Sequence, residues 1–556
     1  MGGRLLWLAR SVLNKRKRFG TPMVQRGFAW WEWQETYFEK MRTPLSLVFA
    51  FVATHNHFVL DRGGKVFKQT APVIKLPVGA SVDEHLALVG VLNSSAACFW
   101  MKQVVQSKGN GGQGGGIKPE HWFRGFEFDG TKLQQFPVPA GSALAYGRLL
   151  DGLAVELASV SAGAVVGRGV PSAEGLAAAR RRFEEIRRVM IAAQEELDWH
   201  AYRLYGLVDE DLTYPIDEVP SLGLAERAFE IVLARKVEAG DEETSWFARH
   251  GSTPITEVPG HWPEGYRRLV ERRIELIEGD LNIGLIEKPE HKRRWNTESW
   301  DAQQERALRM WLLDRLEAPA LWSAQSLQSC AQLADAAARD ADFRSVAALY
   351  AGSEGVDLTK LVTELVAGEA VPYLAAWRYT DDGLRKHAEW LRVWELQRAE
   401  DRGDSVGEIP VPPRYLPKDF RAGCWSHRGK LDVPKERFIA YPGAARGADP
   451  TPVVGWAGWD HAERARALAG WVMQARYDGV DAERLVPLLA GLAELVPWLR
   501  QWHNDPSPDP MLDRIGDQID GLVRAEAQGL GLTVTDLVAW RPPATANKRG
   551  RPRKET

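Results

Sequence analysis

Residues 83–106 read DEHLALVGVLNSSAACFWMKQVVQ and carry the clearest helical pattern in the first 140 residues of the chain. Acidic Asp83 and Glu84 stand in the first turn, where negative charge favours the N-terminal end of a helix. The apolar residues recur near the helical spacing: Leu86, Val89, Leu92, Ala96, Phe99 and Val104. The pattern predicts one helix over these residues.

Four short apolar segments precede this helix and predict strands joined by tight turns. They are residues 44–54, 58–60, 65–67 and 73–76, with the turn signal Asp61-Arg-Gly-Gly64 between the second and the third. One helix packed on these strands makes a mixed first domain, and helical patterns dominate the rest. We therefore predict an α+β protein: a mixed domain, then a mainly helical body and a disordered basic tail.

A long helix is predicted near residue 190. Its apolar seam alternates steps of three and four, which suits packing against a partner helix, and the repeat weakens at His200: Phe183, Ile186, Met190, Ala193 and Leu197. The predicted domains are 1–142 (mixed), 143–205 (helical spacer), 206–320 (mixed α/β or helical), 321–402 (helical), 403–460 (irregular, rich in Pro and Gly), 461–540 (helical) and 541–556 (basic tail).

The formal net charge of −3 is unevenly distributed along the chain. Residues 1–140 hold 18 Lys+Arg against 9 Asp+Glu, a net charge of +9, and residues 541–556 hold 6 against 1, a net charge of +5. The intervening residues 141–540 carry a net charge of −17. Basic ends around an acidic body indicate nucleic acid bound at the ends.

Cysteine usage and hydropathy restrict the compartment. Cys98, Cys330 and Cys424 are far apart and odd in number, which disfavours a disulfide framework or zinc ribbon and fits a reducing cytoplasm. No uncharged apolar run reaches the ~18 residues of a membrane span, and no secretory signal is present. The sequence predicts a soluble, cytoplasmic protein with no membrane partner.

The tail contains Lys548-Arg-Gly-Arg-Pro-Arg-Lys554 and resembles an AT-hook. Proline and glycine keep such a segment extended and let its backbone approach the floor of a narrow groove. Arg549, Arg551 and Arg553 are then suited to an A·T-rich minor groove. The alternative is a generic basic tail.

A glycine run from Gly109 to Gly116 formally matches GxGxxG but follows a predicted helix instead of a strand, so a dinucleotide site is disfavoured. We interpret it as a loop whose backbone N–H groups, with Lys108 and Lys118, approach phosphates; the alternative is a passive linker.

Seven aromatic residues lie between Phe19 and Phe38, beside Lys15-Arg-Lys-Arg18. Such interleaving is typical of nucleic-acid surfaces. We expect most of these rings in the core and Trp31 exposed.

His55-Asn-His57 would place both imidazoles on one face of a strand, where they could ligate a metal. No third ligand is nearby, so structural histidines are favoured and no metal site is predicted. The sequence holds no HExxH, GxSxG, GxxxxGK[ST] or paired-cysteine site.

Several stretches together resemble the PglX family, the adenine-specific DNA methyltransferases of BREX (phage growth limitation) defence, which are related to type IIG restriction-modification enzymes. The residues that carry this resemblance are 52–67, 71–77, 92–95, 196–206, 282–289 and 292–297, and the resemblance extends over most of residues 1–530. It implies the C-terminal half of such an enzyme, with a target-recognition domain in residues 1–142.

The family's catalytic motif is missing. Methyltransferases of this kind hold a flipped adenine with an Asn-Pro-Pro-Tyr type motif and bind S-adenosylmethionine with a glycine-rich loop. Here Val411-Pro-Pro-Arg414 and Arg541-Pro-Pro-Ala544 have only the prolines. We expect no catalytic residue and no cofactor in this chain; S-adenosylmethionine is implied for a missing or partner catalytic domain.

The resemblance and the charge pattern together favour recognition of double-stranded DNA for a methyltransferase of BREX or restriction-modification type, with a catalytic chain and other defence proteins as partners. Recognition needs cations on phosphates and side chains at base edges. The candidate DNA-binding residues are Lys15, Arg16, Lys17, Arg18, Trp31, Lys65, Lys68, Lys102, Lys108, Lys118, Arg549, Arg551 and Arg553. The alternatives are a non-enzymatic, DNA-tethered scaffold for defence proteins and a complete enzyme of unfamiliar design.

Overall fold

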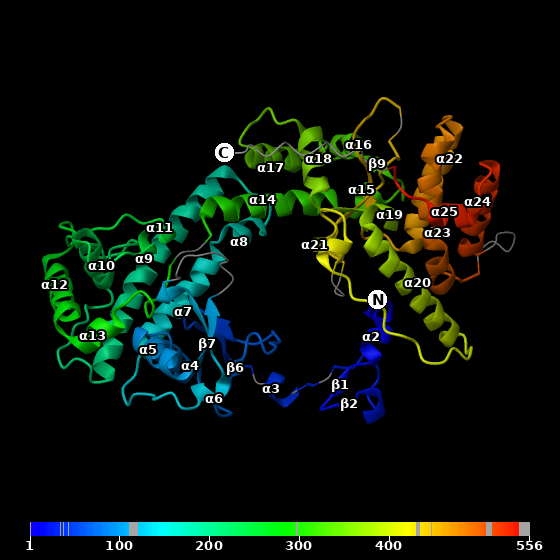
Figure 1. Ribbon diagram of the computed structural model, residues 1–556. Helices are drawn as coiled ribbons and strands as arrows, with labels where there is room; N and C mark the ends of the chain where they lie inside the picture. Colours follow the sequence, from blue (N-terminus) through cyan, green and yellow to red (C-terminus); the bar gives the residue numbers. More distant parts are fainter. Residues whose placement is uncertain are drawn as a thin grey trace, which may run out of the picture. The chain divides into compact units, whose positions relative to one another are not determined.

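The computed structural model describes residues 2–33, 35–36, 38–42, 44–110, 120–295, 298–429, 434–445, 447–506 and 514–543. The α+β class is confirmed. Two compact units make up the chain: unit 1 comprises residues 1–35 and 308–556, and unit 2 comprises residues 36–307 (Figure 1). The boundary falls inside α14 (Trp300–Leu316).

Unit 2 contains two small antiparallel sheets. One has the order β5-β3-β6, and the other β4-β8-β7. Their strands are β3 (Ser46–Phe49), β4 (Val52–Ala53), β5 (Phe58–Asp61), β6 (Val73–Ile74), β7 (Gln106–Asn110) and β8 (Arg124–Glu127). Residues 65–67, expected as a strand, lie outside any strand. The apolar faces pack on α4 (Val82–Leu92) and α5 (Ser95–Val104): Phe58 and Leu60 of β5 are buried, and Val59 between them is exposed.

The predicted single helix over 83–106 is wrong, because the structure divides it into α4 and α5. Asn93 turns its side chain to β5, where its Oδ1 accepts from Phe58 N at 2.9 Å and its Nδ2 donates to Phe58 O at 2.8 Å. Ser94 then caps α5 by accepting from Ala97 N at 3.2 Å. Asn and Ser compete with the helical backbone for hydrogen bonds, which explains the break.

The long helix is confirmed as α9 (Ala173–Leu204), and its whole predicted seam is buried. It packs against α7 (Leu144–Ser159), α8 (Ala162–Val166) and α5. The remaining helices of unit 2 are α3 (Phe38–Arg42), α6 (Gly130–Leu133), α10 (Ala228–Ala239), α11 (Trp246–His250), α12 (Glu264–Gly279), α13 (Leu281–Ile286) and the 3-10 turn η2 (His121–Phe123).

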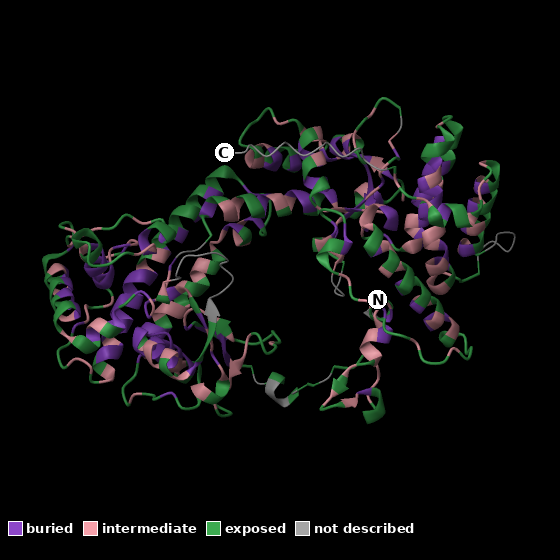
Figure 2. Ribbon diagram, in the orientation of Figure 1, coloured by how far each residue is buried: buried purple, intermediate pink, exposed green. Residues whose placement is uncertain are grey.

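Unit 1 surrounds a sheet with the order β10-β11-β12-β9, in which only β10 and β11 are parallel. Its strands are β9 (Gln328–Ser329), β10 (Ala370–Pro372), β11 (Phe438–Ala440) and β12 (Val453–Trp456). The helices are α15 (Pro319–Trp322), α16 (Cys330–Ala337), α17 (Ala341–Ala351), α18 (Leu358–Ala367), α19 (Ala375–Arg378), α20 (Asp381–Asp401), η3 (Pro417–Asp419), α21 (Trp425–Arg428), α22 (His461–Tyr477), α23 (Ala482–Trp502), α24 (Ile515–Gly529) and α25 (Val534–Ala539). Buried residues run along α22 and α23 (Figure 2).

Residues 1–35 pack within unit 1, whereas the sequence grouped them with residues 36–142. Trp7 Nε1 donates to Asp401 Oδ2 at 2.8 Å, and Trp394 Nε1 donates to Leu8 O at 2.9 Å. Arg10 forms ion pairs with Glu400 and Asp401. These partners are almost 400 residues distant in sequence, so local patterns do not reveal them. The segment consists of α1 (Gly2–Trp7), α2 (Arg10–Asn14), β1 (Lys17–Arg18), β2 (Thr21–Pro22) and η1 (Val24–Arg26).

Candidate nucleic-acid interface

The loop 54–57 between β4 and β5 is held against the junction of α4 and α5. Asn56 Nδ2 donates to Leu92 O at 2.7 Å and to Ser94 O at 3.3 Å, and Asn56 is almost fully buried. Together with the Asn93 bonds to Phe58, these contacts fix the loop from both sides. The two histidines that flank Asn56 are therefore presented in a set position.

A buried ionic network lies beneath this junction. Ser95 donates to Asp198 of α9 through its backbone N at 2.8 Å and its Oγ at 2.7 Å. Lys292 Nζ lies 2.8 Å from Asp198 Oδ2, 2.7 Å from Glu287 Oε1 and 3.5 Å from Glu195 Oε2. All four charged side chains are at most 1% exposed. The network joins α5, α9 and the segment 287–295 into one rigid body.

One lysine faces three carboxylates in this network, and the pKa values reflect the imbalance. Burial and the neighbouring Glu195 and Asp198 raise the pKa of Glu287 to about 7. The three carboxylates in turn hold the pKa of Lys292 above its ordinary value despite its burial. Lys292 is thus a neutralised, structural cation, and breaking such a buried pair is strongly destabilising.

The next residues in the chain, Arg293 and Arg294, contribute to a group of basic side chains that are half-buried except for the exposed His57. We call this group the cationic cluster: His55, His57, Lys102, Arg293 and Arg294. Lys102 donates to the carbonyl of Glu290 and stands 5.0 Å above the ring of Phe126. Arg294 Nη2 donates to Thr54 Oγ1 and, at 2.9 Å, to Trp122 O. The guanidinium of Arg293 lies 5.1 Å from the Trp295 ring centre.

Among the described residues, none of the cluster's lysine and arginine side chains forms an ion pair with a carboxylate. Burial lowers the pKa of Arg293 to about 10, with Asp198 opposing the shift. Burial, together with Arg294, lowers the pKa of Lys102, and burial lowers that of Arg294. The lowered values indicate positive charge that the protein does not neutralise.

The pKa values of the two histidines reflect the same positive charge. Burial first, and then Lys102, Arg293 and Arg294, hold the pKa of His55 well below its ordinary value. Arg293 first, and then burial, lowers the pKa of His57 to about 3. Residues 55–57 lie in a loop and not in a strand, which was the condition for both imidazoles to share one face. Because a bound metal cation would be repelled by the same three cationic side chains, the arrangement suits an anion instead.

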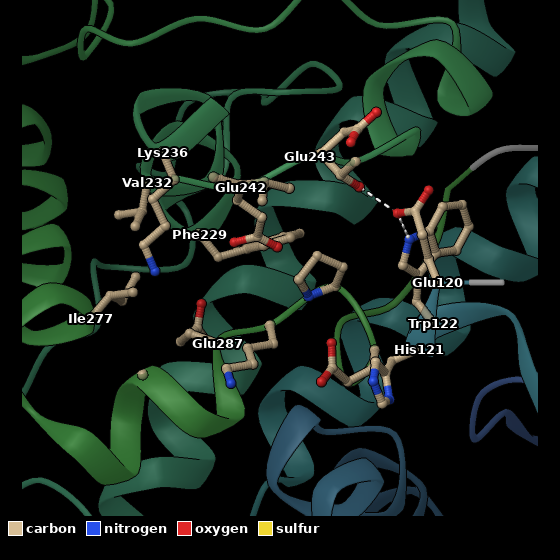
Figure 3. A pocket seen from close by; sticks show the side chains of 16 residues that line it. Glu120, His121, Trp122, Phe229, Val232, Lys236, Glu242, Glu243, Ile277 and Glu287 are labelled. Atoms are coloured by element: carbon tan, nitrogen blue, oxygen red, sulfur yellow. Dashed lines mark hydrogen bonds between the residues drawn. The ribbon is translucent and has the colours of Figure 1, made fainter. Parts of the chain in front are cut away.

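A separate pocket of about 360 Å³ lies in the same unit. Figure 3 shows Phe229, Ile277 and Glu287 on one side of it, and Glu120, His121 and Trp122 on the other. Glu287 Oε2 is buried without a hydrogen-bond partner among the described residues. The lining carries five carboxylates against two lysines: Glu120, Glu242, Glu243, Glu287 and Glu290, with Lys236 and Lys288. Excess negative charge disfavours phosphate in this pocket.

Among the candidate DNA-binding residues that the structure describes, only Lys102 belongs to the cationic cluster. Lys108 instead forms an ion pair with Glu127, while Lys65 and Lys68 are exposed. In unit 1, Lys15 pairs with Glu408, Arg18 pairs with Glu35 at 3.3 Å, and Arg16 donates to Trp30 O and Glu32 O. Lys17 belongs to β1. Lys118, Arg549, Arg551 and Arg553 lie outside the described residues.

The expectation that most rings between residues 19 and 38 are in the core is wrong. Tyr37 lies outside the described residues, and no other ring of this set is buried. Phe19, Trp31, Trp33 and Phe38 are 82%, 57%, 79% and 61% exposed, and Phe28 and Trp30 are half-buried. Trp31 is exposed as predicted, but it is not alone. These rings are not part of the hydrophobic core, and their exposed surfaces are available for contact.

Sequence reasoning missed Arg293 and Arg294 as site residues. Lys292-Arg-Arg-Trp295 is a basic run beside an aromatic residue, the same signal that pointed to residues 15–38. This run lies within residues 141–540, which carry a net negative charge, and is almost 200 residues from Lys102. The charge distribution along the sequence therefore did not mark it as a candidate site. Only the fold brings the two segments together.

A family model described as a domain of unknown function, DUF7008, matches residues 190–553. Adenine-specific methyltransferase PglX of Streptomyces coelicolor is 48% identical over 565 aligned residues, which cover 98% of this chain and 46% of PglX. The chain therefore spans about half the length of this curated relative and matches its C-terminal part, so the resemblance inferred from the sequence is confirmed. No solved structure matches the chain. Within the described residues, every helix is too short or too polar to cross a membrane.

Proposed function

Because this chain belongs to the DUF7008 family and is 48% identical to PglX, we propose that it is the DNA-recognition part of a site-specific adenine methyltransferase of cytoplasmic phage defence. Methyl transfer with S-adenosylmethionine is then performed by residues outside this sequence, which lacks the [Asn/Asp]-Pro-Pro-aromatic motif. The observation that carries the proposal is the cationic cluster, whose lysine and arginines have no carboxylate partner in the described chain.

The cluster's chemistry fits the DNA backbone. A methyltransferase must be positioned on the duplex before it selects a base, and contacts to phosphate provide this positioning. Arg293 and Arg294 are held by a rigid network, so a phosphate meets preorganised donors. The residues that carry the PglX resemblance, including 52–67, 92–95 and 292–295, converge on this cluster. Their convergence supports a functional role for the cluster.

The test measures duplex affinity by fluorescence anisotropy at several salt concentrations. Each phosphate contact contributes about −0.9 to the slope of log K against log salt. The double variant Arg293→Gln/Arg294→Gln is expected to reduce the magnitude of the slope by about 1.8 if both side chains contact phosphate. Arg268→Gln is the matched control, because Arg268 is exposed and already paired with Glu264. Failure of the wild-type chain to bind duplex DNA at low salt would contradict the proposal.

A tail with an AT-hook-like sequence extends the same proposal. Deleting residues 541–556 is expected to weaken binding to A·T-rich duplexes more than binding to G·C-rich duplexes, because arginines favour a narrow minor groove. An equal loss on both duplexes would make the segment a generic basic tail. Comparing the two duplexes at one salt concentration distinguishes these outcomes.

The exposed rings of residues 19–33 favour a second candidate function, a scaffold that binds other defence proteins while its basic parts hold DNA. Exposed aromatic residues are typical anchors of protein interfaces. Co-purification separates the candidates. A recognition part is expected to bind a methyltransferase catalytic chain and to restore site-specific methylation of DNA, whereas a scaffold binds defence proteins without restoring methylation.

A further inference from the structure

A cavity of about 460 Å³ lies within unit 1, between one face of α20 and one face of α23. The α20 residues that line it recur every three to four positions: Leu384, His387, Leu391, Trp394 and Arg398. The α23 residues Ala490, Glu494, Trp498 and Trp502 recur every four positions, and Pro497 beside Trp498 also lines the cavity. Its volume is in the range of small-molecule sites. The two helices therefore line one cavity with facing side chains.

The cavity is rich in aromatic rings. Tyr373 stacks on Tyr441 with ring centres 4.8 Å apart, and Tyr379 stacks on His387 at 5.0 Å. A Cβ at Gly491 would come within 2.4 Å of the Tyr373 ring, so the glycine is what lets this ring lie against α23. Flat π surfaces at several orientations suit a planar heterocycle, which gains by stacking.

Positive charge exceeds negative charge among the lining residues. The cations are Arg378, Arg398, Arg428, Arg464 and Arg541, and the carboxylates are Glu395 and Glu494. Arg464 donates to the carbonyls of Trp459 at 3.0 Å and Ala457 at 2.6 Å, and forms no ion pair within the described chain. Burial and the neighbouring Arg428 lower its pKa. Arg428 forms an ion pair with Glu436, Arg398 with Glu395 and Arg378 with Glu494. Arg464 and Arg541 form none within the described chain, and their charge favours an anionic ligand.

Several lining residues also have unused hydrogen-bonding capacity. Arg398 is 8% exposed; its Nε donates to Gln501 and its Nη1 to Glu395, while its Nη2 has no partner among the described residues. Tyr373 Oη and Arg428 Nε are also buried without a hydrogen-bond partner among the described residues. Pro497 lacks the N–H that would otherwise bond to the carbonyl of Ala493, and both residues line the cavity. Buried polar groups without partners are costly, and a polar ligand would satisfy them.

We propose that this cavity binds a nucleotide unit, with its base against the aromatic rings and its phosphate on the arginines. The unit is supplied either by a free nucleotide or by a single strand of DNA. This inference rests on unit 1 alone and does not depend on the cationic cluster of unit 2.

The test uses the full chain and isothermal titration calorimetry. The probes are adenosine 5′-monophosphate, adenosine, inorganic phosphate and a single-stranded oligonucleotide of ten thymidines. We expect adenosine 5′-monophosphate to bind at least tenfold more tightly than adenosine or phosphate, because only the nucleotide engages both the rings and the arginines. Binding of the oligonucleotide without the free nucleotide would support the single-strand source. Binding of neither would overturn the proposal.

Two variants locate the binding. Arg464→Gln removes a half-buried cation and is expected to weaken binding at least tenfold. Val538→Glu places a negative charge at a lining residue that is 62% exposed, so folding is retained, and is also expected to weaken binding at least tenfold. Val155→Glu, at a valine of unit 2 that is 58% exposed, is the matched control. Equal affinity of Val538→Glu and the wild type would place the ligand elsewhere and overturn the proposal.

Discussion

Lys292 and Arg293 are consecutive residues of similar charge, yet their surroundings differ completely. Lys292 is fully buried and meets three carboxylates within 3.5 Å. Arg293 is half-buried and stacks on Trp295 without an ion pair in the described chain. The first cation holds α9 to the segment 287–295, whereas no carboxylate of the described chain neutralises the charge of the second.

The comparison teaches that a basic run does not identify binding residues until its carboxylate partners are known. Lys15, Arg18 and Lys108 are basic in sequence, but each is paired in the structure. Lys102, Arg293 and Arg294 are not paired with carboxylates among the described residues, and their pKa values are lowered. Unneutralised charge in a partly buried position is the feature that marks a candidate anion site.

The largest expected effect comes from breaking the neutralised cation. Lys292→Met leaves Asp198, Glu195 and Glu287 buried without their shared partner, and is expected to lower the free energy of unfolding by about 3–5 kcal/mol. Urea denaturation measures this loss. Lys288→Met is the control, because Lys288 is exposed in the same segment and is expected to stay within about 0.5 kcal/mol. Equal effects of the two substitutions would refute the structural role of Lys292.

A pH dependence follows from the same network. The pKa of Glu287 is raised to about 7 from 4.5, so the folded state retains a proton that the unfolded state has lost. This group therefore destabilises the fold progressively as pH rises from 4.5 to 7, by up to about 3 kcal/mol. Relative to the wild type, Glu287→Gln is expected to gain stability over that range and to level off above it. If the difference in free energy of unfolding between Glu287→Gln and the wild type is constant from pH 4.5 to 8, the raised pKa of Glu287 is contradicted.

Two lysines on neighbouring elements sharpen the distinction between paired and unpaired cations. Lys102→Gln is expected to reduce the magnitude of the salt slope of duplex binding by about 0.9, as for one phosphate contact. Lys108→Gln is expected to change it less, because Glu127 already neutralises Lys108. Salt titrations of both variants by fluorescence anisotropy show which substitution changes the salt slope more. A larger change in the salt slope for Lys108→Gln than for Lys102→Gln would mean that an ion pair with a carboxylate does not keep a lysine from contacting phosphate.

The smallest expected effect concerns His57. Its pKa of about 3 makes it neutral at pH 7.5, so it releases no counterion when DNA binds. His57→Gln is therefore expected to leave the salt slope unchanged at that pH. A reduction near 0.9 would mean that His57 becomes protonated in the complex, and that the DNA phosphate overcomes the repulsion by Arg293.

Local patterns were sufficient for much of the fold. The buried seam of α9 and the α+β class follow from residue spacing, because amphipathic periodicity is a property of neighbouring residues. The division of residues 83–106 into α4 and α5 does not follow from spacing, since it depends on the bonds of Asn93 to β5. Residues 1–35 pack in unit 1 for a similar reason, because their partners, such as Asp401, are distant in sequence.

The sequence alone determined the resemblance to PglX, the basic ends and the aromatic segment, since each is a matter of residue order and composition. It also pointed to Lys102, but as one of thirteen candidates. Only the tertiary structure decided which cations are neutralised: it buried Lys292 among carboxylates and gathered Lys102, Arg293 and Arg294 around His55. The physical reason is that a side chain's charge is neutralised by whatever lies within a few ångströms, and those neighbours come from elements far apart in the chain.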